Sequence, residues 1–442
     1  MGLRRRIIAA VAAATLVATT AGCSGEDAAD GRVSLLVFGS PDELAAYRTL
    51  ASAYQKTAGG ATVSLIEATD REDLITRLST SLAGGEPPDL FLMNYRFYGQ
   101  FAARDALTPL DERLAASTTL RAADLYPQAT AAFQWRGRQL CLPQNVSSLV
   151  VYYNRDLFRR YAVPEPAADW TWNDFVATAI GLTRDVHGRT VKGAEPETAP
   201  APVAVHGLGM DPELIRLAPL VWSFGGALVD DPRRPTRLTL DTPQARAALA
   251  EFVALRGTHG VTPLDEEAES HDLESRFVNG KLGMLMSSRR STTTLRRSAG
   301  FDWDVAPFPV AGTPAGILHS DAYCMPRGAA NPDGAWRFVE YALGPAGARV
   351  MAATGRTVPS LRSVAESPAF LDPGARPRRA KVFLDAIPTI RRTPAISTWP
   401  QIEDITADLL ENAFYRGDDL TTVVAELDRQ TRPLFARGEA SS

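Results

Sequence analysis

The sequence predicts an α/β protein, and three observations lead to this prediction. Its 442 residues, 45% of them hydrophobic and 22% charged, are enough to bury the cores of two lobes. Short apolar strands alternate with amphipathic helices over the first part of the chain, as in a parallel sheet covered by helices. Polar and aromatic residues follow these strands, where each strand should emerge into a loop.

The charge balance narrows the choice of partners. The formal net charge is −4, and it becomes −7 without residues 1–22, because that stretch holds three arginines and no acidic residue. A mildly acidic chain argues against a nucleic-acid partner. The composition is that of an ordinary globular protein rather than of a disordered or fibrous one.

The amino terminus has the features of an export signal. Arg4–Arg6 form a positive region, and an apolar stretch from Ile7 to Thr19 precedes a small-residue cleavage site. Cys23, directly after that site, resembles the lipid-attachment cysteine of a bacterial lipobox. The resemblance implies a lipoprotein signal peptide over residues 1–22, a diacylglyceryl group on Cys23 and a flexible tether over residues 23–31. The alternative is a plain secretory peptide with an incidental cysteine.

The lipid would hold the mature protein at the outer face of the cell membrane. No later apolar run approaches the roughly 20 residues that a second membrane span needs.

The first predicted elements are a strand and a capped helix. Val33–Phe38 is an apolar strand, and Ser40 and Glu43 have the spacing of a capping box, with Pro41 at the first helical position. These two residues either only cap the helix or also contact a ligand, since free N–H groups at a helix N-terminus bind sugar hydroxyls as readily as anions.

Two more strands, Val63–Glu67 and Leu90–Met93, flank a predicted helix over Asp70–Leu82. Ligands of parallel sheets lie outside the carboxyl ends of the strands. Asn94 and Tyr95 come directly after the third strand, so we expect them at a ligand site beside the first loop.

The second half of the chain continues this alternation. A helix within Leu217–Val229 carries Trp222 and ends at Gly225, and Phe277–Ser287 is typical of a helix end, a glycine turn and a buried strand. The last helix is predicted to begin at a cap, Thr398, because apolar residues follow it at helical spacing.

Three phrases of the sequence, PDLFLMN, GRQLCLPQNVSSLVVYYNRDLF and FVNGKLGMLMSS, resemble the extracellular carbohydrate-binding proteins of ABC importers, the family that includes maltodextrin-binding protein. The resemblance extends over nearly the whole mature chain. It implies the two-lobed fold of type II periplasmic binding proteins, with crossing strands that form a hinge. Residues 32–144 and 322–372 would form the N-lobe, and residues 145–321 and 373–436 the C-lobe.

The same resemblance places ligand contacts in loops around the cleft between the lobes. A pyranose ring presents flat C–H faces to aromatic rings and in-plane hydroxyls to polar side chains. Trp399, at the start of the last helix, is expected to stack on a sugar ring, whereas core packing remains an alternative for Trp222. The implied ligand-binding residues are Ser40, Glu43, Asn94, Tyr95, Asn145, Ser147, Trp222, Ser287, Arg289, Asp321, Tyr323, Arg356 and Trp399.

One departure from the family concerns Ser287 and Arg289. Many relatives carry an aromatic residue there, so the sequence weakens the case for a simple neutral maltodextrin. An amino sugar, a disaccharide or a glycerophosphodiester would each suit Arg289, Arg356 and Asp321, and the sequence leaves these alternatives open.

Cys141 and Cys324 are the remaining cysteines of a chain predicted to be exported, where oxidation is permitted. In the family the chain crosses between the lobes near both positions, so the resemblance favours a disulfide that staples the hinge strands. Two buried thiols are the alternative. Neither cysteine has metal-ligand spacing to another cysteine or a histidine, so no metal is expected.

The sequence contains none of the catalytic motifs G-x-S-x-G, S-x-x-K, H-E-x-x-H, G-x-G-x-x-G or a Walker A loop, and its five histidines are scattered. Neither an enzymatic activity nor a cofactor is therefore expected. Asp302 and Asp304 could pair as in a glycoside hydrolase, but acid pairs on a strand edge are usually solvated.

We therefore predict a monomeric substrate-binding lipoprotein of an ABC importer. It would capture a sugar or sugar derivative between its lobes and, after hinge closure, deliver it to the permease subunits in the membrane. Two alternatives stay open: a secreted carbohydrate-active hydrolase, and a sensor or scaffold lipoprotein without transport.

Overall fold

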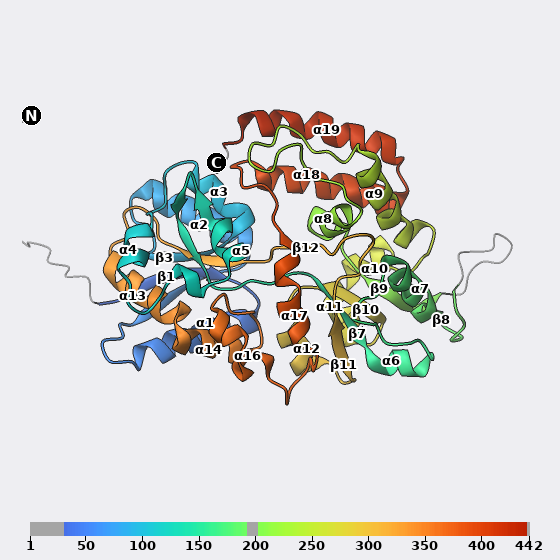
Figure 1. The fold of residues 1–442 in the computed structure, drawn as a ribbon, viewed down its shortest axis with the longest axis horizontal. Helices are drawn as coiled ribbons and strands as arrows, with labels where there is room; N and C mark the ends of the chain where they lie inside the picture. Colours follow the sequence, from blue (N-terminus) through green and yellow to red (C-terminus); the bar gives the residue numbers. More distant parts are fainter. Residues whose placement is uncertain (1–30, 192–201, 440–442) are drawn as a thin grey trace, which may run out of the picture. The chain divides into compact units, whose positions relative to one another are not determined.

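The structure, a computed structural model, describes residues 31–191 and 202–439 (Figure 1). The predicted signal peptide, the predicted lipidation site Cys23 and nearly all of the predicted tether lie outside these residues. The described residues form an α/β fold with two lobes, each built on a five-stranded sheet that carries helices. The predicted fold class is therefore confirmed.

The first sheet has the strand order β2-β1-β3-β13-β6. β1 pairs in parallel with β2 and β3, whereas β13 runs antiparallel to both β3 and β6. The carboxyl ends of β1, β2 and β3 therefore lie at one edge of the sheet, as the sequence predicted. The strands are β1 (Val33–Phe38), β2 (Val63–Ala68), β3 (Leu90–Asn94), β6 (Cys141–Pro143) and β13 (Asp321–Cys324).

The second sheet has the strand order β11-β7-β10-β9-β8. β9 and β10 are parallel, and the other neighbours run antiparallel. The strands are β7 (Val150–Asn154), β8 (Arg184–Asp185), β9 (Val203–Gly209), β10 (Leu282–Ser287) and β11 (Trp303–Ala306). Two short pairs complete the strands of the described residues: β4 (Gln134–Trp135) with β5 (Arg138–Gln139), and β12 (Gly316–Ile317) with β14 (Ile390–Arg391).

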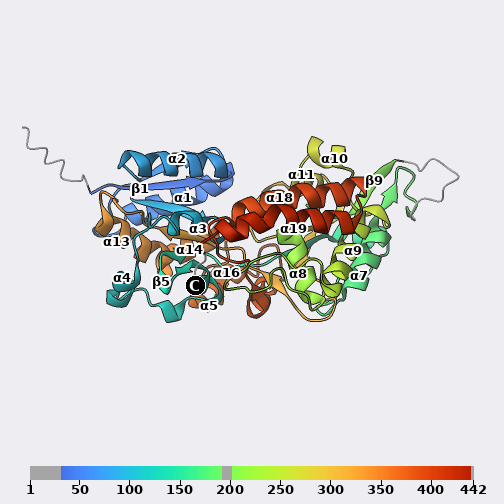
Figure 2. The ribbon, with the colours of Figure 1, turned by 90° about the horizontal axis from the view of Figure 1, so that it is seen from above.

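Helices cover both sheets. α18 and α19 pack side by side, as both views show, and α18 also contacts α3 and α8 (Figures 1 and 2). The α-helices of the described residues are α1 (Pro41–Gln55), α2 (Arg71–Gly84), α3 (Tyr95–Ala102), α4 (Asp111–Ala116), α5 (Pro127–Thr130), α6 (Arg155–Arg160), α7 (Trp172–Leu182), α8 (Leu214–Ser223), α9 (Pro243–Gly257), α10 (Asp265–Ser270), α11 (Leu273–Val278), α12 (Ser291–Ser298), α13 (Pro332–Leu343), α14 (Pro345–Ala353), α15 (Arg362–Ala365), α16 (Pro368–Leu371), α17 (Lys381–Asp385), α18 (Trp399–Glu411) and α19 (Leu420–Arg437). The remaining short helices are η1 (Ala122–Asp124), η2 (Ala131–Phe133), η3 (Ile387–Thr389) and the π-helix η4 (Asn412–Arg416).

Two helices of the first lobe begin where a strand ends. Ser40 and Glu43 form the predicted capping box of α1: the Ser40 hydroxyl accepts from the Glu43 N–H at 3.4 Å, and the Glu43 carboxylate accepts from the Ser40 N–H at 2.6 Å. Asn94, the last residue of β3, caps α3 by accepting from the Arg96 N–H at 3.2 Å. Both N-termini therefore lie at the carboxyl edge of the first sheet.

The second lobe repeats this arrangement without side-chain caps. α8 follows β9 and α12 follows β10, and the two strands are parallel, so both helices begin at the same edge of the second sheet. Neither helix has a side-chain cap at its N-terminus. The first N–H groups of these helices are therefore left for backbone, solvent or ligand acceptors.

Two chain segments that cross between the sheets run beside each other. Ser147, between β6 and β7, and His319, just before β13, exchange backbone hydrogen bonds of 3.0 and 2.8 Å. These segments correspond to the crossing strands that the sequence predicted.

Cys141 and Cys324 form a disulfide, which confirms the predicted pairing. The two residues are direct partners in the register of β6 and β13, with Cα atoms 4.4 Å apart. The bridge therefore lies inside the first sheet, on the strands that lead into the crossing segments, rather than across the hinge itself.

Buried apolar side chains form two clusters. The first surrounds the first sheet and extends to residues such as Leu285 and Val305 of the second, and the other joins Val151 and Met284 to the helices of the second lobe. Within residues 31–191 and 202–439, no helix has the length and apolar character needed to cross a membrane.

Candidate ligand-binding cleft

The carboxyl edges of the two sheets enclose a cavity of about 300 Å³, which we call the cleft. Its walls come from the ends of β1, β3 and β10, the first turns of α1, α3 and α8, residues 288–290 just before α12, and the crossing segments. Eight of the residues proposed from the sequence line it: Glu43, Asn94, Asn145, Ser147, Ser287, Arg289, Asp321 and Arg356.

Three further proposed residues lie outside the cleft lining. Ser40 serves as the cap of α1. Tyr95 is 1% exposed, and its hydroxyl accepts from the Thr393 hydroxyl at 3.2 Å. Tyr323 follows Asp321 by two residues and shares its face of β13, but it lies deeper in the sheet, where its hydroxyl donates to Gln144 Oε1 at 3.0 Å.

Neither proposed tryptophan lines the cleft. Trp222 is 6% exposed and belongs to the second core cluster. Trp399 is fully buried, packs edge-on against Phe435 and donates its indole N–H to Glu403 at 2.8 Å. A ring that stacks on a sugar must have an open face. In this structure Trp399 is therefore a core residue, which corrects the position expected from the sequence.

The reason for this burial is tertiary. Thr398 does not cap α18, because its hydroxyl donates to the Leu434 carbonyl of α19 at 2.9 Å. The start of α18 therefore packs against α19 instead of facing the cleft.

The structure also adds residues that the sequence analysis left out. The rule applied to the first lobe, that helices after parallel strands begin at the ligand edge, would have found Arg216 at the start of α8. His319 had no local signal, because its position depends on the pairing of the crossing segments. Arg96 and Ser288, which the strand-end pattern also indicates, line the cleft as well. The added lining residues with polar or aromatic side chains are Phe38, Tyr47, Arg71, Phe97, Asp211, Glu213, Arg216, Arg290 and His319.

Asp321 is at the centre of a polar network in the cleft. Asn94 Nδ2 donates to Asp321 Oδ1 at 3.1 Å, and Asn145 Nδ2 donates to Oδ2 at 3.4 Å. The Asp321 N–H in turn donates to Asn145 Oδ1 at 2.6 Å. The carboxylate is thereby held in one orientation, with lone pairs left to accept from ligand hydroxyls.

A second charged group lies where α1 begins. Arg356 Nη2 is 2.5 Å from Glu43 Oε1. Burial alone would lower the pKa of Arg356, but Tyr47, Glu43 and Asp321 raise it above its ordinary value. Burial also raises the pKa of Tyr47 to about 12, so at neutral pH the wall presents a cation, a carboxylate and a neutral phenol.

Arg96 links the start of α3 to α18. Its Nη1 lies 2.8 Å from Glu403 Oε2, the carboxylate that also accepts from Trp399. Burial alone would lower the pKa of Arg96, but Glu403 and Tyr95 raise it above its ordinary value. Trp399 therefore acts on the cleft indirectly, because it orients the partner of a lining arginine.

The side chain of His319 is influenced by the charges of three arginines that line the cleft. Burial, followed by the charges of Arg216, Arg96 and Arg290, lowers the pKa of His319 well below its ordinary value. The imidazole is therefore neutral at physiological pH. Among the described residues, no group of three or more His, Cys, Asp or Glu side chains is placed to hold a metal ion.

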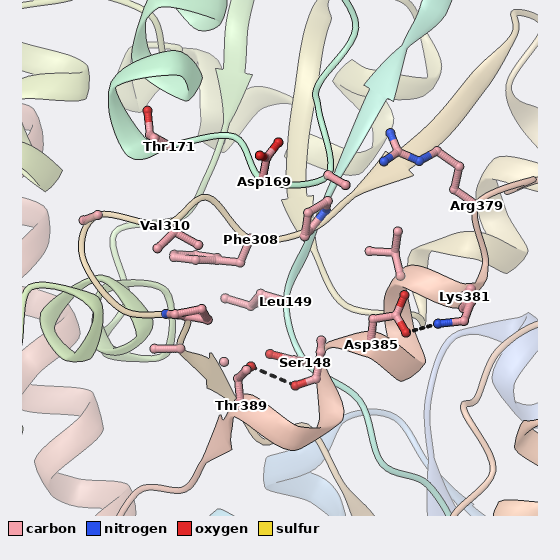
Figure 3. Close-up of a pocket in the computed structure, with 18 of the residues that line it drawn as sticks. Ser148, Leu149, Asp169, Thr171, Phe308, Val310, Arg379, Lys381, Asp385 and Thr389 are labelled. Carbon is pink, nitrogen blue, oxygen red and sulfur yellow. Dashed lines mark hydrogen bonds and ion pairs between the residues drawn. The ribbon is translucent and has the colours of Figure 1, made fainter.

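A second cavity, of about 740 Å³, lies beside the same crossing segment (Figure 3). Ser148 lines this cavity and Ser147 lines the cleft, because successive side chains of an extended segment point to opposite sides. Leu149, Phe308 and Val310 contribute apolar walls. We call it the Phe308 cavity.

Three of the four charged residues that line the Phe308 cavity have polar partners. Lys381 pairs with Asp385 (Figure 3). Arg379 Nη1 donates to the Pro166 carbonyl at 3.0 Å. No residue that lines this cavity has a buried side-chain nitrogen or oxygen without a partner. The cleft is the smaller cavity, but it is the one with chemistry to offer a polar solute.

Residues 49–378, about three quarters of the chain, match the family described as bacterial extracellular solute-binding proteins. The chain belongs to this family, and its role is to bind a solute outside the cytoplasm. The predicted family is thereby confirmed.

Individual relatives are distant in sequence. A binding protein of Brucella abortus is 21% identical over 345 residues, which cover 77% of this chain and 78% of the relative. A maltotriose-binding protein of Pyrococcus abyssi is 22% identical over 314 residues, covering 68% of this chain and 60% of the relative.

Solved structures share the fold. An ABC substrate-binding protein of Listeria monocytogenes, in complex with cycloalternan, has a TM-score of 0.80 and 21% identity, over 92% of this chain and 99% of that one. UgpB from Mycobacterium tuberculosis, in complex with glycerophosphocholine, has a TM-score of 0.77 and 22% identity, over 91% and 98%.

Proposed function

We propose that this protein is the ligand-capturing component of an ABC importer, and that it binds a sugar or sugar derivative in the cleft and delivers it to permease subunits. The observation that carries the proposal is the Asp321 carboxylate, held between Asn94 and Asn145 where segments of both lobes meet. An acceptor whose orientation is already set loses little entropy when it binds a hydroxyl. The relatives described above with cycloalternan and glycerophosphocholine support a ligand of this class.

Capture would occur by closure of the lobes on the ligand. In the proposed mechanism, ion pairs between helices assigned to different lobes favour the closed form: Arg96 of α3 with Glu403 of α18, and Asp42 of α1 with Arg297 of α12. The closed form would dock on the permease, and the ligand would leave chemically unchanged.

The proposal includes the predictions for the amino terminus and the lobes. The chain would be exported, cleaved before Cys23 and anchored by a lipid to the outer face of the membrane. The N-lobe would comprise residues 32–144 and 322–372, and the C-lobe residues 145–321 and 373–436. The protein would have no enzymatic activity.

The test is calorimetry of the purified protein with a panel of sugars, amino sugars, disaccharides and glycerophosphodiesters. For the ligand that binds, Asp321→Ala should weaken affinity about 100-fold, because the ligand hydroxyls lose their hydrogen bonds to a charged acceptor. Asp333→Ala, which removes an exposed carboxylate paired with Arg113, is the matched control and should leave affinity unchanged. Unchanged binding by Asp321→Ala in a folded protein would refute this site, and release of product from an oligosaccharide would favour the hydrolase.

A further inference from the structure

We infer that the ligand of the cleft carries an oxyanion, such as a phosphate ester, a phosphodiester or a carboxylate, and that Arg289 and Arg290 bind it at the N-terminus of α12. The inference rests on the proposed function, because it names the class of sugar derivative that the same cleft takes. Four features of the described residues support it.

The first feature is the charge of the lining. Six arginines face four acidic residues, and the arginines are Arg71, Arg96, Arg216, Arg289, Arg290 and Arg356. Three of them are neutralised, since Arg356 pairs with Glu43, Arg216 with Asp211 and Arg96 with Glu403.

The other three arginines have no carboxylate within ion-pair distance among the described residues. Arg71 lies over the Phe97 ring, 4.4 Å from its centre. Arg289 and Arg290 stand together at the start of α12. The two lining carboxylates without an ion pair, Glu213 and Asp321, belong to other segments, so the α12 end of the cleft is cationic.

The second feature is Arg289 itself, which is 1% exposed. Its Nε donates to the Gly355 carbonyl at 2.8 Å, but Nη1 and Nη2 are buried and have no partner. The rings of Phe370 and Phe383 lie 4.7 and 5.0 Å from the guanidinium carbon. Burial lowers the pKa of Arg289 to about 10, so the group is still charged at neutral pH. A buried guanidinium without acceptors is costly, and an oxyanion would supply them.

The third feature is a common pattern among the unsatisfied atoms. Five buried side-chain atoms without a partner belong to cleft-lining residues, and all five are nitrogens: Arg216 Nε, Arg289 Nη1 and Nη2, His319 Nε2 and Arg356 Nε. No buried side-chain oxygen of the lining lacks a partner. The four guanidinium nitrogens can only donate, so the cleft is short of acceptors, which are what phosphate and carboxylate oxygens provide.

The fourth feature is the helix end. α12 is eight residues long, begins directly after Arg290 and has no side-chain cap. The hydroxyls of Ser287 and Ser291 lie 2.7 Å apart beside it. The Ser291 and Thr292 N–H groups donate to the Ser288 and Arg289 carbonyls at 3.4 and 3.0 Å, so the contribution of the helix end is its dipole, which attracts negative charge. Combined with this dipole, Arg289 and Arg290 form a donor site for an oxyanion, separate from the Asp321 network that would read hydroxyls.

The experiment compares ligands that share a polyol and differ in the oxyanion they carry: glycerol with anionic glycerol 3-phosphate and zwitterionic glycerophosphocholine, and glucose with anionic glucose 1-phosphate and glucuronate. By calorimetry, at least one anionic member should bind the wild-type protein at least tenfold more tightly than its neutral counterpart. That affinity should fall as sodium chloride is added, since salt screens the charges. Glucose 1-phosphate and glucuronate distinguish a phosphate from a carboxylate as the source of the oxyanion.

Substitutions of single arginines test whether the oxyanion binds at the start of α12. Arg290→Gln should weaken binding of the anionic ligand on the order of tenfold, consistent with the loss of one charge-assisted hydrogen bond, and leave the weak binding of the neutral member unchanged. Arg104→Gln is the matched control, because Arg104 is also exposed and has no hydrogen bond or ion pair within the described residues. Arg289→Gln should weaken binding of the anionic ligand more than Arg290→Gln does. This result is interpreted only if circular dichroism shows that the Arg289→Gln protein folds.

Three results would count against the inference. A neutral sugar that binds as tightly as all its anionic counterparts would overturn it and leave the proposed function standing. Equal effects of Arg290→Gln and Arg104→Gln on the anionic ligand would also overturn the assignment to α12. If a folded protein bound no member of either series, and no sugar of the wider panel, the proposed function would fall as well.

Discussion

The cleft and the Phe308 cavity lie on two sides of one crossing segment, yet their walls differ in kind. The Phe308 cavity, about 740 Å³, has apolar walls, and no residue of its lining has a buried side-chain nitrogen or oxygen without a partner. The cleft, about 300 Å³, holds arginines with buried guanidinium nitrogens that lack acceptors. The volume of a cavity therefore does not identify the ligand site in this protein. Unsatisfied polar groups do, because leaving them without partners costs free energy that a ligand can recover.

If the ligand stacked on an aromatic ring outside both cavities, the cleft would not be the ligand site. Trp399 is the residue that tests this alternative. Trp399→Ala should lower the free energy of unfolding by about 3–5 kcal/mol, because it leaves a large cavity between α18 and α19. Urea denaturation measures this loss. Trp399→Phe should cost less, since it keeps most of the packing and loses the hydrogen bond to Glu403. A Trp399→Ala protein with full stability and no ligand binding would contradict the core position and restore the stacking role.

The pH dependence of stability tests a second difference, between a histidine in the cleft and one in the second sheet. Burial lowers the pKa of His206 to about 4, although the Glu267 carboxylate is 3.6 Å from its Nε2. Burial and the neighbouring Arg216, Arg96 and Arg290 lower the pKa of His319 well below its ordinary value. Both histidines are therefore neutral when folded. In the unfolded chain each takes up a proton below about pH 6.5.

Because the unfolded state binds more protons, stability should be full above about pH 6.5 and fall as the pH drops toward 4. Each histidine contributes up to about 1.4 kcal/mol per pH unit in that window. Urea denaturation from pH 7.5 to 5 should show the decline, and His206→Gln and His319→Gln should each make it shallower. A bound oxyanion should raise the pKa of His319 and thereby reduce only the part of the pH dependence of stability that His319 contributes. Identical slopes in the wild type and both variants would refute the assignment.

The smallest effects come from a matched pair of partly buried phenylalanines, Phe308 beside the larger cavity and Phe38 in the cleft. Each change to Ala should cost about 1–2 kcal/mol of stability, since only part of the ring is buried. Phe38→Ala should also weaken ligand affinity several-fold through lost apolar contact, whereas Phe308→Ala should leave it within about twofold. A larger loss of affinity in Phe308→Ala would make the Phe308 cavity part of the ligand site.

Much of the fold could be predicted because its signals are local. The alternation of β1, α1, β2, α2 and β3, the capping box of Ser40 and Glu43 and the position of Asn94 at a strand end all depend on neighbours within a few residues. The resemblance to a family supplied the long-range pairings, such as the one between Cys141 and Cys324.

The errors concern burial. Trp399 follows a predicted cap and looks accessible from its own sequence context, but Phe435 and Leu434 of α19 cover the start of α18. Trp222 and Tyr95 likewise have aromatic side chains near a predicted site, and both are in the core. The period of a helix shows which residues share a face, but not what packs against that face.

The α/β alternation, the caps and the edge at which a ligand site could form follow from backbone geometry and local side-chain patterns, so the amino-acid sequence is enough to predict them. Which polar residues share the cleft, and which of them lack partners, depends on how distant segments pack. Arg289 is an example, because its one hydrogen-bond partner, the Gly355 carbonyl, is 66 residues away in the chain.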